Sequence, residues 1–417
     1  MQKIRFIIIL LIFGCFIASD KELKTAPKSK ISKTSKKKMK FSNVEDAEPY
    51  LETFRNAFLH LREHYVDSLN ESEIIRAGIK GMFNPLDKYT LLLSKDGKES
   101  LDRIYTGKYG GIGISMGPIK DTLTVLSVSE NAPAYSEGLI PGDQILMVDS
   151  TSTHRMRVKD VSNLIKGEVG TTVDLNIRRP STKVKKVFTL ERSDVKLQNI
   201  HNLGIDKNGI GYIKINRFSK GISQDFLSYL DSYDSSEDLR GIIIDVRSNK
   251  GGLLSESIKI LDLLTHKGDT LLERRGKRSS YHLSRRRPVI GTEYPIVILQ
   301  NKKSASASEI LAGVLQDLDR AVVVGERSFG KGLVQNTKHL NDTTSIKITT
   351  AKFYTPSGRL IQENDYMSNG FLTDRLGDKD SLFYTTNGRI VKGGGGIEPD
   401  YNVKSDKIPG YISKLWQ

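Results

Sequence analysis

The chain has 417 residues, a single Cys and a net charge of +15, with 64 Lys and Arg against 49 Asp and Glu. This length is enough for two or three domains with cores of their own, and a lone Cys excludes a disulfide framework or a thiolate metal cluster within one chain. Roughly half of the excess positive charge lies in residues 20–42, which hold nine Lys and two acidic residues.

The N-terminus predicts an export signal. Residues 1–5 carry two basic side chains, and the apolar run FIIILLIF follows at 6–13. The run continues in part to Ala18, and an apolar segment of about 13 residues is too short to span a ~30 Å hydrocarbon core comfortably. We therefore interpret residues 1–19 as a signal peptide and residues 20–42 as a flexible basic linker, either a solvated tether or a segment that binds anionic lipid headgroups. Because an export signal precedes this basic stretch, nucleic acid is not expected as a partner.

The only Cys, Cys15, comes at the end of the apolar region, after Ile12-Phe13-Gly14. This pattern resembles the lipobox of bacterial lipoproteins, which has a branched apolar residue three positions before the Cys and a small residue directly before it. Phe13 is bulkier than that pattern prefers, so simple cleavage near Ala18 and an uncleaved anchor stay as alternatives to lipidation. The expected location is the periplasm or cell envelope, with membrane association through the N-terminus.

The next two regions differ in their periodicity. Residues 43–104 are expected to be helical, because apolar side chains from Leu51 to Tyr65 recur at spacings of three and four. Residues 105–195 instead alternate short β-rich runs with turn signals, and they hold one expected helix at 158–165. This second pattern predicts a small β-rich module.

Residues 196–405 have the pattern of an α/β domain, with a C-terminal tail at 406–417. The expected strands are 210–215, 241–245, 294–299 and 321–324, and the expected helices are 219–233, 253–265 and 308–318. Such alternation predicts a mostly parallel sheet covered by helices. The arginine-rich stretch 274–287 falls between expected elements and should face solvent.

Three loops of this domain follow expected strands, where open α/β sheets place their sites. The first, 245–252, ends in Gly251-Gly252, which could be a tight turn or half of an oxyanion hole. The second, 301–310, presents a Ser where a strand turns sharply into a helix. That turn could serve a nucleophile, because a helix N-terminus favours developing negative charge, or it could be a Ser-rich cap with Ser308 at the helix start and Glu309 in the first turn.

The third loop, 325–335, holds Lys331 between two glycines. A phosphate-binding role is disfavoured, because Gly332 stands where a Walker loop needs Ser or Thr and because the loop leads into an expected strand. Lys331 is the better candidate base for a serine nucleophile, provided that burial lowers its pKa from about 10.4 toward 7. Asp317 is not suited to that role, because on an unbroken helix it lies roughly 16 Å from Ser306.

No metal and no organic cofactor are expected. The seven His are scattered along the chain, and we expect among them no H-x-x-x-H pair on a helix of the kind that zincin metalloenzymes use.

Several strings resemble the C-terminal processing peptidases, also called tail-specific proteases. They are DVRSNKGGLL (245–254), SASASEILAG (304–313), SFGKGLVQ (328–335), FYTPSGRLIQ (353–362) and GGGGIEPD (393–400). Upstream, YGGIGISM (109–116) and NAPAYSEGLIPGDQILMVD (131–149) resemble the PDZ domain of that family, and LDKYT (86–90) resembles the segment before it.

This resemblance implies an α+β multidomain protein. A helical N-terminal segment at 43–104 would precede a PDZ domain at 105–195 and a serine protease core at 196–405. The core would have a mostly parallel, helix-covered sheet related to the ClpP and crotonase folds.

The same resemblance implies the roles of individual residues in the core. Ser306, the middle Ser of SASAS, would be the nucleophile, Lys331 its base, and Gln335 the residue that orients the Lys. In a straight strand positions 331 and 335 would lie about 13 Å apart, so the chain must bend near them. The oxyanion hole would consist of the N–H of Ala307 and a glycine of the pair Gly251 and Gly252.

The PDZ module would bind the apolar C-terminal tail of a protein substrate by strand addition. The loop that would cradle the terminal carboxylate consists of Tyr109, Gly110, Gly111, Ile112 and Gly113. The expected activity is that of an exported serine endopeptidase that acts near the C-termini of proteins, with homo-oligomerisation left open. Two alternatives are a PDZ adaptor with an inactive protease domain and a crotonase-like acyl-CoA enzyme.

Overall fold

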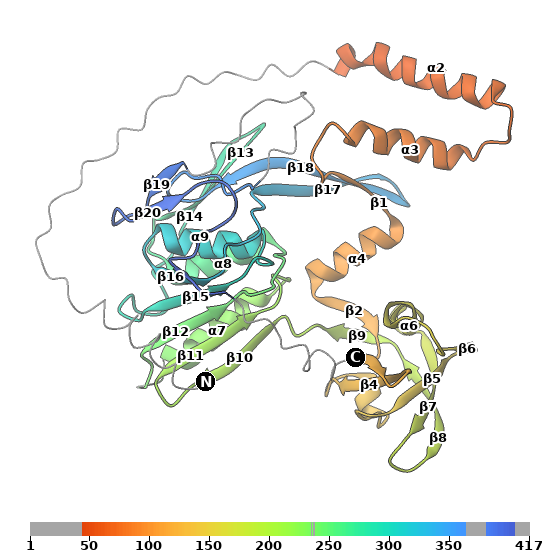
Figure 1. The fold of residues 1–417 in the computed structure, drawn as a ribbon, viewed down its shortest axis with the longest axis horizontal. Helices are drawn as coiled ribbons and strands as arrows, with labels where there is room; N and C mark the ends of the chain where they lie inside the picture. Colours follow the sequence, from red (N-terminus) through yellow and green to blue (C-terminus); the bar gives the residue numbers. More distant parts are fainter. Residues whose placement is uncertain (1–43, 235, 237, 364–380, 405–417) are drawn as a thin grey trace, which may run out of the picture. The chain divides into compact units, whose positions relative to one another are not determined.

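The computed structural model describes residues 44–234, 236, 238–363 and 381–404. It divides into two compact units, one that ends at Glu71 and one that begins at Ser72 (Figure 1). No described helix is both long and apolar enough to cross a membrane. The expected signal peptide, the basic linker and the C-terminal tail from 406 onward lie outside the described residues, and so does Cys15.

The first unit contains the 3-10 helix η1 (Val44–Ala47) and the helix α2 (Glu48–His64). None of the apolar side chains whose spacing predicted α2 is buried. The expectation about histidine pairs was wrong, because His60 and His64 lie four residues apart on this helix. Together with Glu63 they bring three potential metal-ligating atoms within 4.8 Å of one another, all on exposed side chains.

The second unit begins with two helices and a strand, α3 (Glu71–Phe83), β1 (Leu91–Ser94) and α4 (Lys95–Thr106). The strand β1 was not expected, and it pairs antiparallel with a long strand far along the chain, β18. α4 ends at Gly107, which has a left-handed φ of +69°. A Cβ on Gly107 would lie 2.8 Å from the Oγ of Ser219, so glycine is required where the helix approaches the α/β region.

Residues 108–196 form a β module around its own hydrophobic core. Its sheet has the order β3-β4-β5-β7-β8, with β6 paired to β5, so that β3 is an edge strand. β2 and β9 pair antiparallel at the two ends of the module. The elements are β2 (Lys108–Gly111), β3 (Ile114–Ile119), β4 (Thr122–Val128), α5 (Pro133–Ser136), β5 (Gln144–Val148), β6 (Thr151–Ser152), α6 (Val158–Ile165), β7 (Thr172–Arg179), β8 (Val184–Glu191) and β9 (Ser193–Lys196).

The main sheet of the α/β region has the order β10-β11-β12-β15-β16-β21. Its neighbouring strands run parallel, except that β10 and β11 pair antiparallel. Near-continuous apolar runs predicted most of these strands, because a parallel sheet is covered on both faces. The elements are β10 (Ile200–Ile205), β11 (Ile210–Ile215), α7 (Ile222–Asp234), β12 (Gly241–Asp245), α8 (Leu254–Leu264), β15 (Ile296–Gln300), α9 (Ala307–Asp317), β16 (Ala321–Gly325) and β21 (Tyr401–Asn402).

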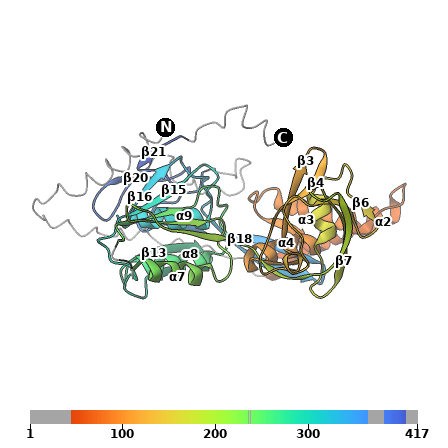
Figure 2. The same cartoon turned by 90° about the horizontal axis from the view of Figure 1, so that it is seen from below.

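A second sheet has the order β1-β18-β13-β14, and β17 also pairs with β18. Figure 2 shows α9 between β15 and β16 on one side and β13 on the other. Every residue of α9 is buried, and one core cluster joins this helix to both sheets. The remaining elements are β13 (Thr270–Gly276), β14 (Ser280–Leu283), β17 (Leu333–Asn341), β18 (Thr344–Tyr354), β19 (Leu382–Tyr384) and β20 (Ile390–Lys392).

The arginine-rich stretch 274–287 is not a connection between elements, as had been expected. Arg274 and Arg275 lie in β13, and the chain then turns into β14 to complete a hairpin. Arg274 is half-buried, whereas Arg285, Arg286 and Arg287 are exposed. The hairpin escaped notice because its charged strands contain no apolar run long enough to predict a strand.

Candidate active site

The strand β15 turns abruptly into α9 at Ser306. Ser306 is the N-cap of α9, with φ +58° and ψ −113°, a left-handed backbone that costs a residue other than glycine about 1–3 kcal/mol. The expectation that Ser308 caps the helix was therefore wrong, because the helix begins one residue earlier, at Ala307. Such strain is characteristic of turns that present a reactive side chain at a strand end.

The two neighbouring serines are engaged elsewhere. Ser304 is buried and donates through Oγ to the carbonyl oxygen of Val246 at 2.8 Å. Ser308 is also buried and donates through Oγ to the carbonyl oxygen of Asn249 at 2.9 Å. The Oγ of Ser306, which is only half-buried, accepts from the backbone N–H of Glu309 in a capping box. Among the hydrogen bonds of the described residues, none has this hydroxyl group as the donor. Of the three hydroxyl groups, that of Ser306 is the one left for a ligand.

The glycine loop lies directly against this turn. Gly251 has φ +92°, and a Cβ on it would lie 2.9 Å from the Cβ of Ser306, so no other side chain fits there. The N–H of Gly251 donates to Oδ1 of Asn249 at 2.8 Å and is thereby occupied. In contrast, the hydrogen bonds of the described residues use neither the N–H of Gly252 nor that of Ala307. Of the two glycines expected to contribute an N–H to the oxyanion hole, Gly252 is therefore the one whose N–H is available.

Lys331 and Gln335 are in direct contact. The Nζ of Lys331 donates to Oε1 of Gln335 at 2.9 Å. A long lysine side chain and a register shift between Val334 and Gln335 close the distance that a straight strand would leave between the two backbones. The Nε2 of Gln335 in turn donates to the carbonyl oxygen of Tyr89 at 2.7 Å, and the Tyr89 ring lies 4.6 Å from the Nζ of Lys331.

A buried carboxylate joins the nucleophile turn to the lysine loop. Glu309, in the first turn of α9, accepts hydrogen bonds from the N–H groups of Ser306 at 2.7 Å, Gly330 at 2.6 Å and Lys331 at 2.9 Å. It also accepts one from the Oγ of Ser328 at 2.6 Å. Burial raises the pKa of Glu309, while these four hydrogen bonds act in the opposite direction. Both loops are thus positioned by one side chain.

The environment of Lys331 favours its neutral form. The pKa of Lys331 is lowered to about 8, mainly by burial and also by the neighbouring cation Lys347, while Asp87 and Glu309 act in the opposite direction. A lysine with this pKa is neutral in about a tenth of molecules at pH 7. The nitrogen is therefore available as a proton acceptor near neutral pH, which is the property that a lysine base for Ser306 needs.

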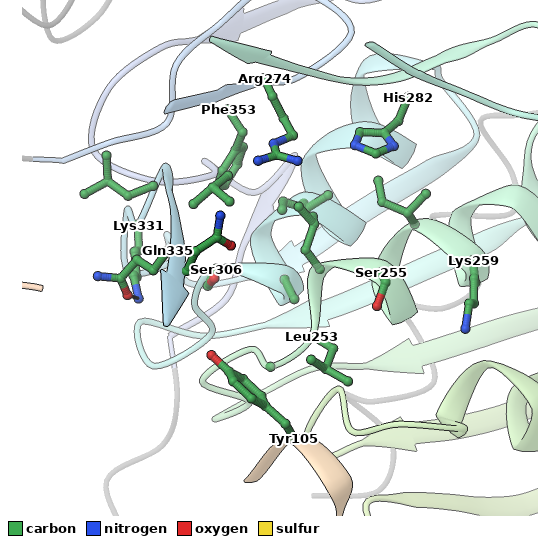
Figure 3. A pocket seen from close by; sticks show the side chains of 18 of the residues that line it. Tyr105, Leu253, Ser255, Lys259, Arg274, His282, Ser306, Lys331, Gln335 and Phe353 are labelled. Atoms are coloured by element: carbon green, nitrogen blue, oxygen red, sulfur yellow. Dashed lines mark hydrogen bonds between the residues drawn. The ribbon is translucent and has the colours of Figure 1, made fainter. Parts of the chain in front are cut away.

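These groups line one pocket of about 1020 Å³. Figure 3 shows Ser306, Lys331 and Gln335 on one side of it, and Gly252 and Ala307 belong to the same wall. Among the hydrogen bonds of the described residues, none joins the Oγ of Ser306 to the Nζ of Lys331. The pocket thus brings together five of the six core residues that the sequence singled out, all but Gly251, while Lys331 is bonded to Gln335.

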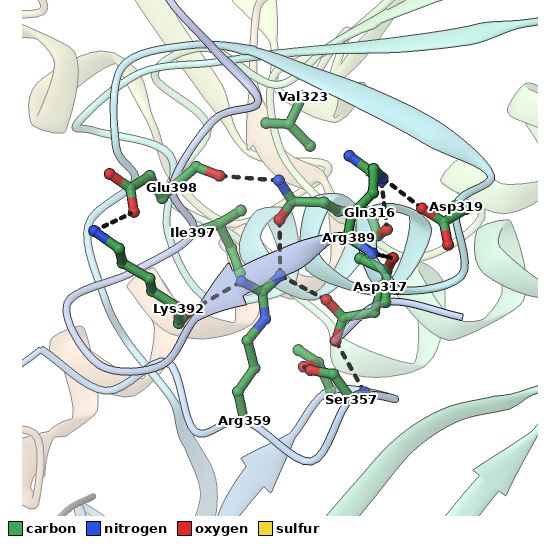
Figure 4. A network of polar contacts seen from close by, with 12 residues as sticks. Gln316, Asp317, Asp319, Val323, Ser357, Arg359, Arg389, Lys392, Ile397 and Glu398 are labelled. Carbon is green, nitrogen blue, oxygen red and sulfur yellow. Dashed lines mark hydrogen bonds and ion pairs between the residues drawn. The ribbon is translucent and has the colours of Figure 1, made fainter. Parts of the chain in front are cut away.

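Asp317 is held in a separate polar network at the far end of α9 (Figure 4). Its Oδ1 lies 2.7 Å from Nη2 of Arg359, and both side chains are fully buried. Arg359 also donates to Oε1 of Gln316 at 2.7 Å, and Arg389 donates to the carbonyl oxygen of Gln316 at 3.0 Å. Asp317 therefore anchors the segment around Arg359 and β20 and does not reach the pocket lining.

The loop that was expected to cradle a carboxylate is partly a strand. Residues Tyr109 to Gly111 belong to β2 and pair with β9. Ile112 is buried in the core of the β module, and Gly113 has φ +78° in the turn that enters β3. Only Ile112 and Gly113 thus lie in the turn itself.

Sequence reasoning overlooked three residues of this site. Glu309 had been considered only as part of a helix cap, and Lys347 had not been considered at all. Tyr89 had appeared within the string LDKYT, which carries no chemistry of its own. The one signal for Tyr89 was that LDKYT belongs to the strings that resemble the family. The carbonyl group of Tyr89 accepts a hydrogen bond from Gln335, which lies more than 200 residues away in the chain.

Two family models match the chain. Residues 209–369 match the model described as peptidase family S41, and residues 124–179 match the model of the PDZ domain.

The chain is also similar to individual bacterial proteins. It is 29% identical to the carboxy-terminal processing protease CtpB of Bacillus subtilis over 386 residues, which are 87% of this chain and 78% of that protein. It is 33% identical to the carboxyl-terminal-processing protease of Synechocystis sp. over 325 residues, which are 76% of this chain and 74% of that protein. Among solved structures, the photosystem II D1 C-terminal processing protease is 22% identical, with 87% of this chain and 89% of that chain covered and a TM-score of 0.47.

Proposed function

Because this chain belongs to the family of carboxy-terminal processing proteases and is therefore a serine-type peptidase, we propose that it cleaves protein substrates near their C-termini with a dyad of Ser306 and Lys331. One observation carries this proposal. A lysine whose pKa is lowered to about 8 and a serine on a strained turn line the same pocket.

The acylation step follows from the positions of these groups. Oγ of Ser306 attacks the carbonyl carbon of the scissile bond while neutral Lys331 takes the hydroxyl proton. The hydrogen bond to Gln335 holds one N–H of Lys331 and leaves its lone pair for that proton. The tetrahedral oxyanion accepts hydrogen bonds from the N–H groups of Gly252 and Ala307, which are preorganised donors at the pocket wall.

In the remaining steps Lys331 first gives up the proton that it took from Ser306 and then takes one from water. Protonated Lys331 donates to the leaving amine as the peptide bond breaks, and an acyl group stays on Ser306. Lys331 is then neutral again and takes a proton from a water molecule that attacks the acyl carbon. Collapse of the second tetrahedral intermediate returns the proton to Oγ of Ser306 and releases the new C-terminus.

We propose that the PDZ domain binds the tail of the substrate. β3 is an edge strand, and an extended peptide can add to such an edge by main-chain hydrogen bonds. Ile112 and Gly113 precede β3 directly, which supports a role for their backbone in binding the terminal carboxylate of an added strand. The turn at Ile112 and Gly113 then selects free C-termini, and the apolar side chains of the tail give affinity.

The proposal extends to fold kinship and location. A mostly parallel sheet whose buried helix begins at the nucleophile supports a core related to the ClpP and crotonase folds. The basic and then apolar N-terminus supports export to the periplasm or cell envelope, with the lipid anchor on Cys15. Membrane association would follow from that anchor.

Single substitutions of the three serines test the activity. Ser306→Ala should abolish casein cleavage and labelling by a fluorophosphonate, because it removes the nucleophile. Ser304→Ala loses the hydrogen bonds of its hydroxyl to Val246 and Asn301, and Ser308→Ala loses the one to Asn249. Both variants should retain measurable cleavage, which makes them matched controls. Full activity in Ser306→Ala would refute the assignment, and a wild-type chain that binds tails but never labels or cleaves would favour the adaptor. Binding of coenzyme A would favour the acyl-CoA enzyme.

A further inference from the structure

The pocket that contains Ser306 carries an unbalanced positive charge. Its lining includes seven Lys or Arg and only two Asp. Both Asp are already paired with bases outside the lining, since Asp102 lies 2.9 Å from Nζ of Lys98 and Asp262 lies 3.6 Å from Nε of Arg286. Of the seven basic residues, Lys259 is paired with Glu256, 2.7 Å away. No ion pair of the other six is found among the described residues, so an anionic group in the substrate would be attracted to the pocket.

Two of the basic side chains lack the partners that such groups normally have. Nε of Arg274 on β13 and Nε2 of His282 on β14 are shielded from water and have no hydrogen-bond partner among the described residues. Unpaired buried donors are rare in native proteins and call for an explanation. Burial lowers the pKa of His282, and so do the nearby cations Arg274 and Arg285, which favours the neutral imidazole. No ion pair between Arg274 and a carboxylate is found in the part of the chain that the structure describes.

The sheet register gives the distance from these groups to the dyad. Arg274 is paired with Phe353 across β13 and β18, and the N–H of Phe353 donates to the carbonyl oxygen of Gly332 at 3.0 Å. Adjacent strands lie about 4.8 Å apart, so Arg274 is about 10 Å from the backbone next to Lys331. An extended peptide advances about 3.3 Å per residue, and a group about three residues from the scissile bond would reach Arg274.

We propose that the pocket contains a carboxylate-binding subsite, formed by Arg274 and His282 on the β13–β14 hairpin. It selects peptides that carry a carboxylate about three residues from the scissile bond. Figure 3 shows both side chains extending into the pocket from these strands. A guanidinium binds a carboxylate through two parallel hydrogen bonds, and an imidazole N–H adds a third donor. The inference rests on the proposed peptidase function and names a substrate class for it.

The carboxylate has two sources of identical chemistry, an acidic side chain and the free C-terminus of the peptide. Two peptide series separate them. In the first, amidated neutral peptides carry Glu or Gln at each position in turn, and in the second, one neutral peptide carries a free or an amidated C-terminus. The kcat/KM of each peptide is measured with the full chain, with Arg274→Gln and with Arg278→Gln. Arg278 is exposed between β13 and β14, so Arg278→Gln is the control that removes the same charge from the same hairpin.

We expect the wild-type chain to prefer one carboxylate-bearing peptide over its neutral partner by about tenfold or more. Arg274→Gln should reduce that ratio to about one while it cleaves the neutral peptide within about twofold of the wild-type rate, and Arg278→Gln should keep the ratio. The series in which the ratio collapses identifies the source of the carboxylate. Arg274→Lys, which keeps the charge without the planar fork, should retain only part of the preference.

Failure of the subsite can be distinguished from failure of the peptidase. Cleavage of all peptides at equal rates by the wild-type chain would overturn the subsite and leave the peptidase intact, and so would an undiminished preference in Arg274→Gln with a wild-type circular dichroism spectrum. If no peptide is cleaved, fluorescence anisotropy on Ser306→Ala still measures the binding of the same labelled peptides. Equal affinity for charged and neutral peptides there would overturn the subsite, and tighter binding of the charged peptide that is lost with Arg274→Gln would support it.

Discussion

Lys331 shows how far a local environment can change one side chain. Its nitrogen is flanked by the Tyr89 ring and by the amide of Gln335, and burial does more to lower its pKa than any neighbouring charge. The same amino acid on the exposed surface would be protonated in almost every molecule at pH 7. The proposed base therefore depends on the residues packed around it.

Replacement of Lys331 should separate a base from a simple positive charge. Lys331→Ala should lower kcat/KM by about 100-fold or more, which is the usual contribution of a general base. Lys331→Arg should fail to restore activity, because a guanidinium keeps its proton at working pH. Cleavage of a fluorogenic peptide, with circular dichroism to verify folding, measures both variants. We would abandon the dyad if Lys331→Arg turned over at the wild-type rate.

Lys347 should contribute to the pH range in which the reaction runs. The rate of cleavage should rise with pH through about 8 as Lys331 loses its proton, since the pKa of Lys331 is lowered to about 8. Lys347→Gln removes a cation that lowers this pKa, so the rising limb of the pH–rate profile should move to higher pH. Lys338 is exposed on the neighbouring strand, and Lys338→Gln is the control that should leave the limb in place. An unshifted limb in Lys347→Gln would contradict the assigned environment.

At the scale of elements, α9 combines two tasks at its two ends. Its first turn carries Ser306 and Glu309, and its last turn carries Asp317 in the network with Arg359. Only the first end reaches the pocket. A substitution at the last turn should therefore affect stability more than chemistry.

Asp317→Ala tests this separation. The substitution leaves Arg359 buried without its carboxylate, and loss of one partner of a buried ion pair costs about 3–5 kcal/mol. We expect urea denaturation to show a decrease of that order in the free energy of unfolding, while the molecules that remain folded still cleave peptide. A folded Asp317→Ala protein as inactive as Ser306→Ala would show instead that Asp317 takes part in the reaction.

The elements that sequence predicted and those it missed differ in how they are buried. β11, β12 and β16 match their expected runs closely, because strands covered on both faces need unbroken apolar sequences. β1 was missed because four residues between two helices carry too little periodicity, and the β13–β14 hairpin was missed because its side chains are mainly charged. The core residues of the pocket could be named from motifs, whereas the roles of Glu309 and Tyr89 depend on contacts between distant segments that no local pattern encodes.

At the scale of the whole molecule, the N-terminal sequence should decide where the enzyme acts. Residues 20–42 carry nine Lys, and each basic residue near an anionic membrane contributes about 1 kcal/mol to binding. One acyl chain alone anchors a protein only marginally, so a lipid on Cys15 and this basic segment would act together. A tether of this length would leave the pocket free to meet its substrates near the membrane.

Cys15→Ser tests the anchor. The variant should appear in the soluble periplasmic fraction or accumulate as an unprocessed precursor, as followed by cell fractionation and immunoblotting. Its peptidase activity in detergent extracts should be unchanged, which controls for folding. Normal processing and membrane association in Cys15→Ser would instead favour an uncleaved apolar anchor.

The complete burial of α9 has a consequence for the proteins that this peptidase can degrade. Because every residue of the helix that begins after Ser306 is buried, the nucleophile cannot move out of the pocket to reach a folded surface. The chain of the substrate therefore has to unfold locally and enter the pocket. The lifetime of a target then follows its own local unfolding equilibrium. A target whose C-terminal segment is bound to its own fold more tightly by about 1.4 kcal/mol should survive about ten times longer. The peptidase would thus spare well-folded proteins and degrade those whose C-terminal segments have unfolded.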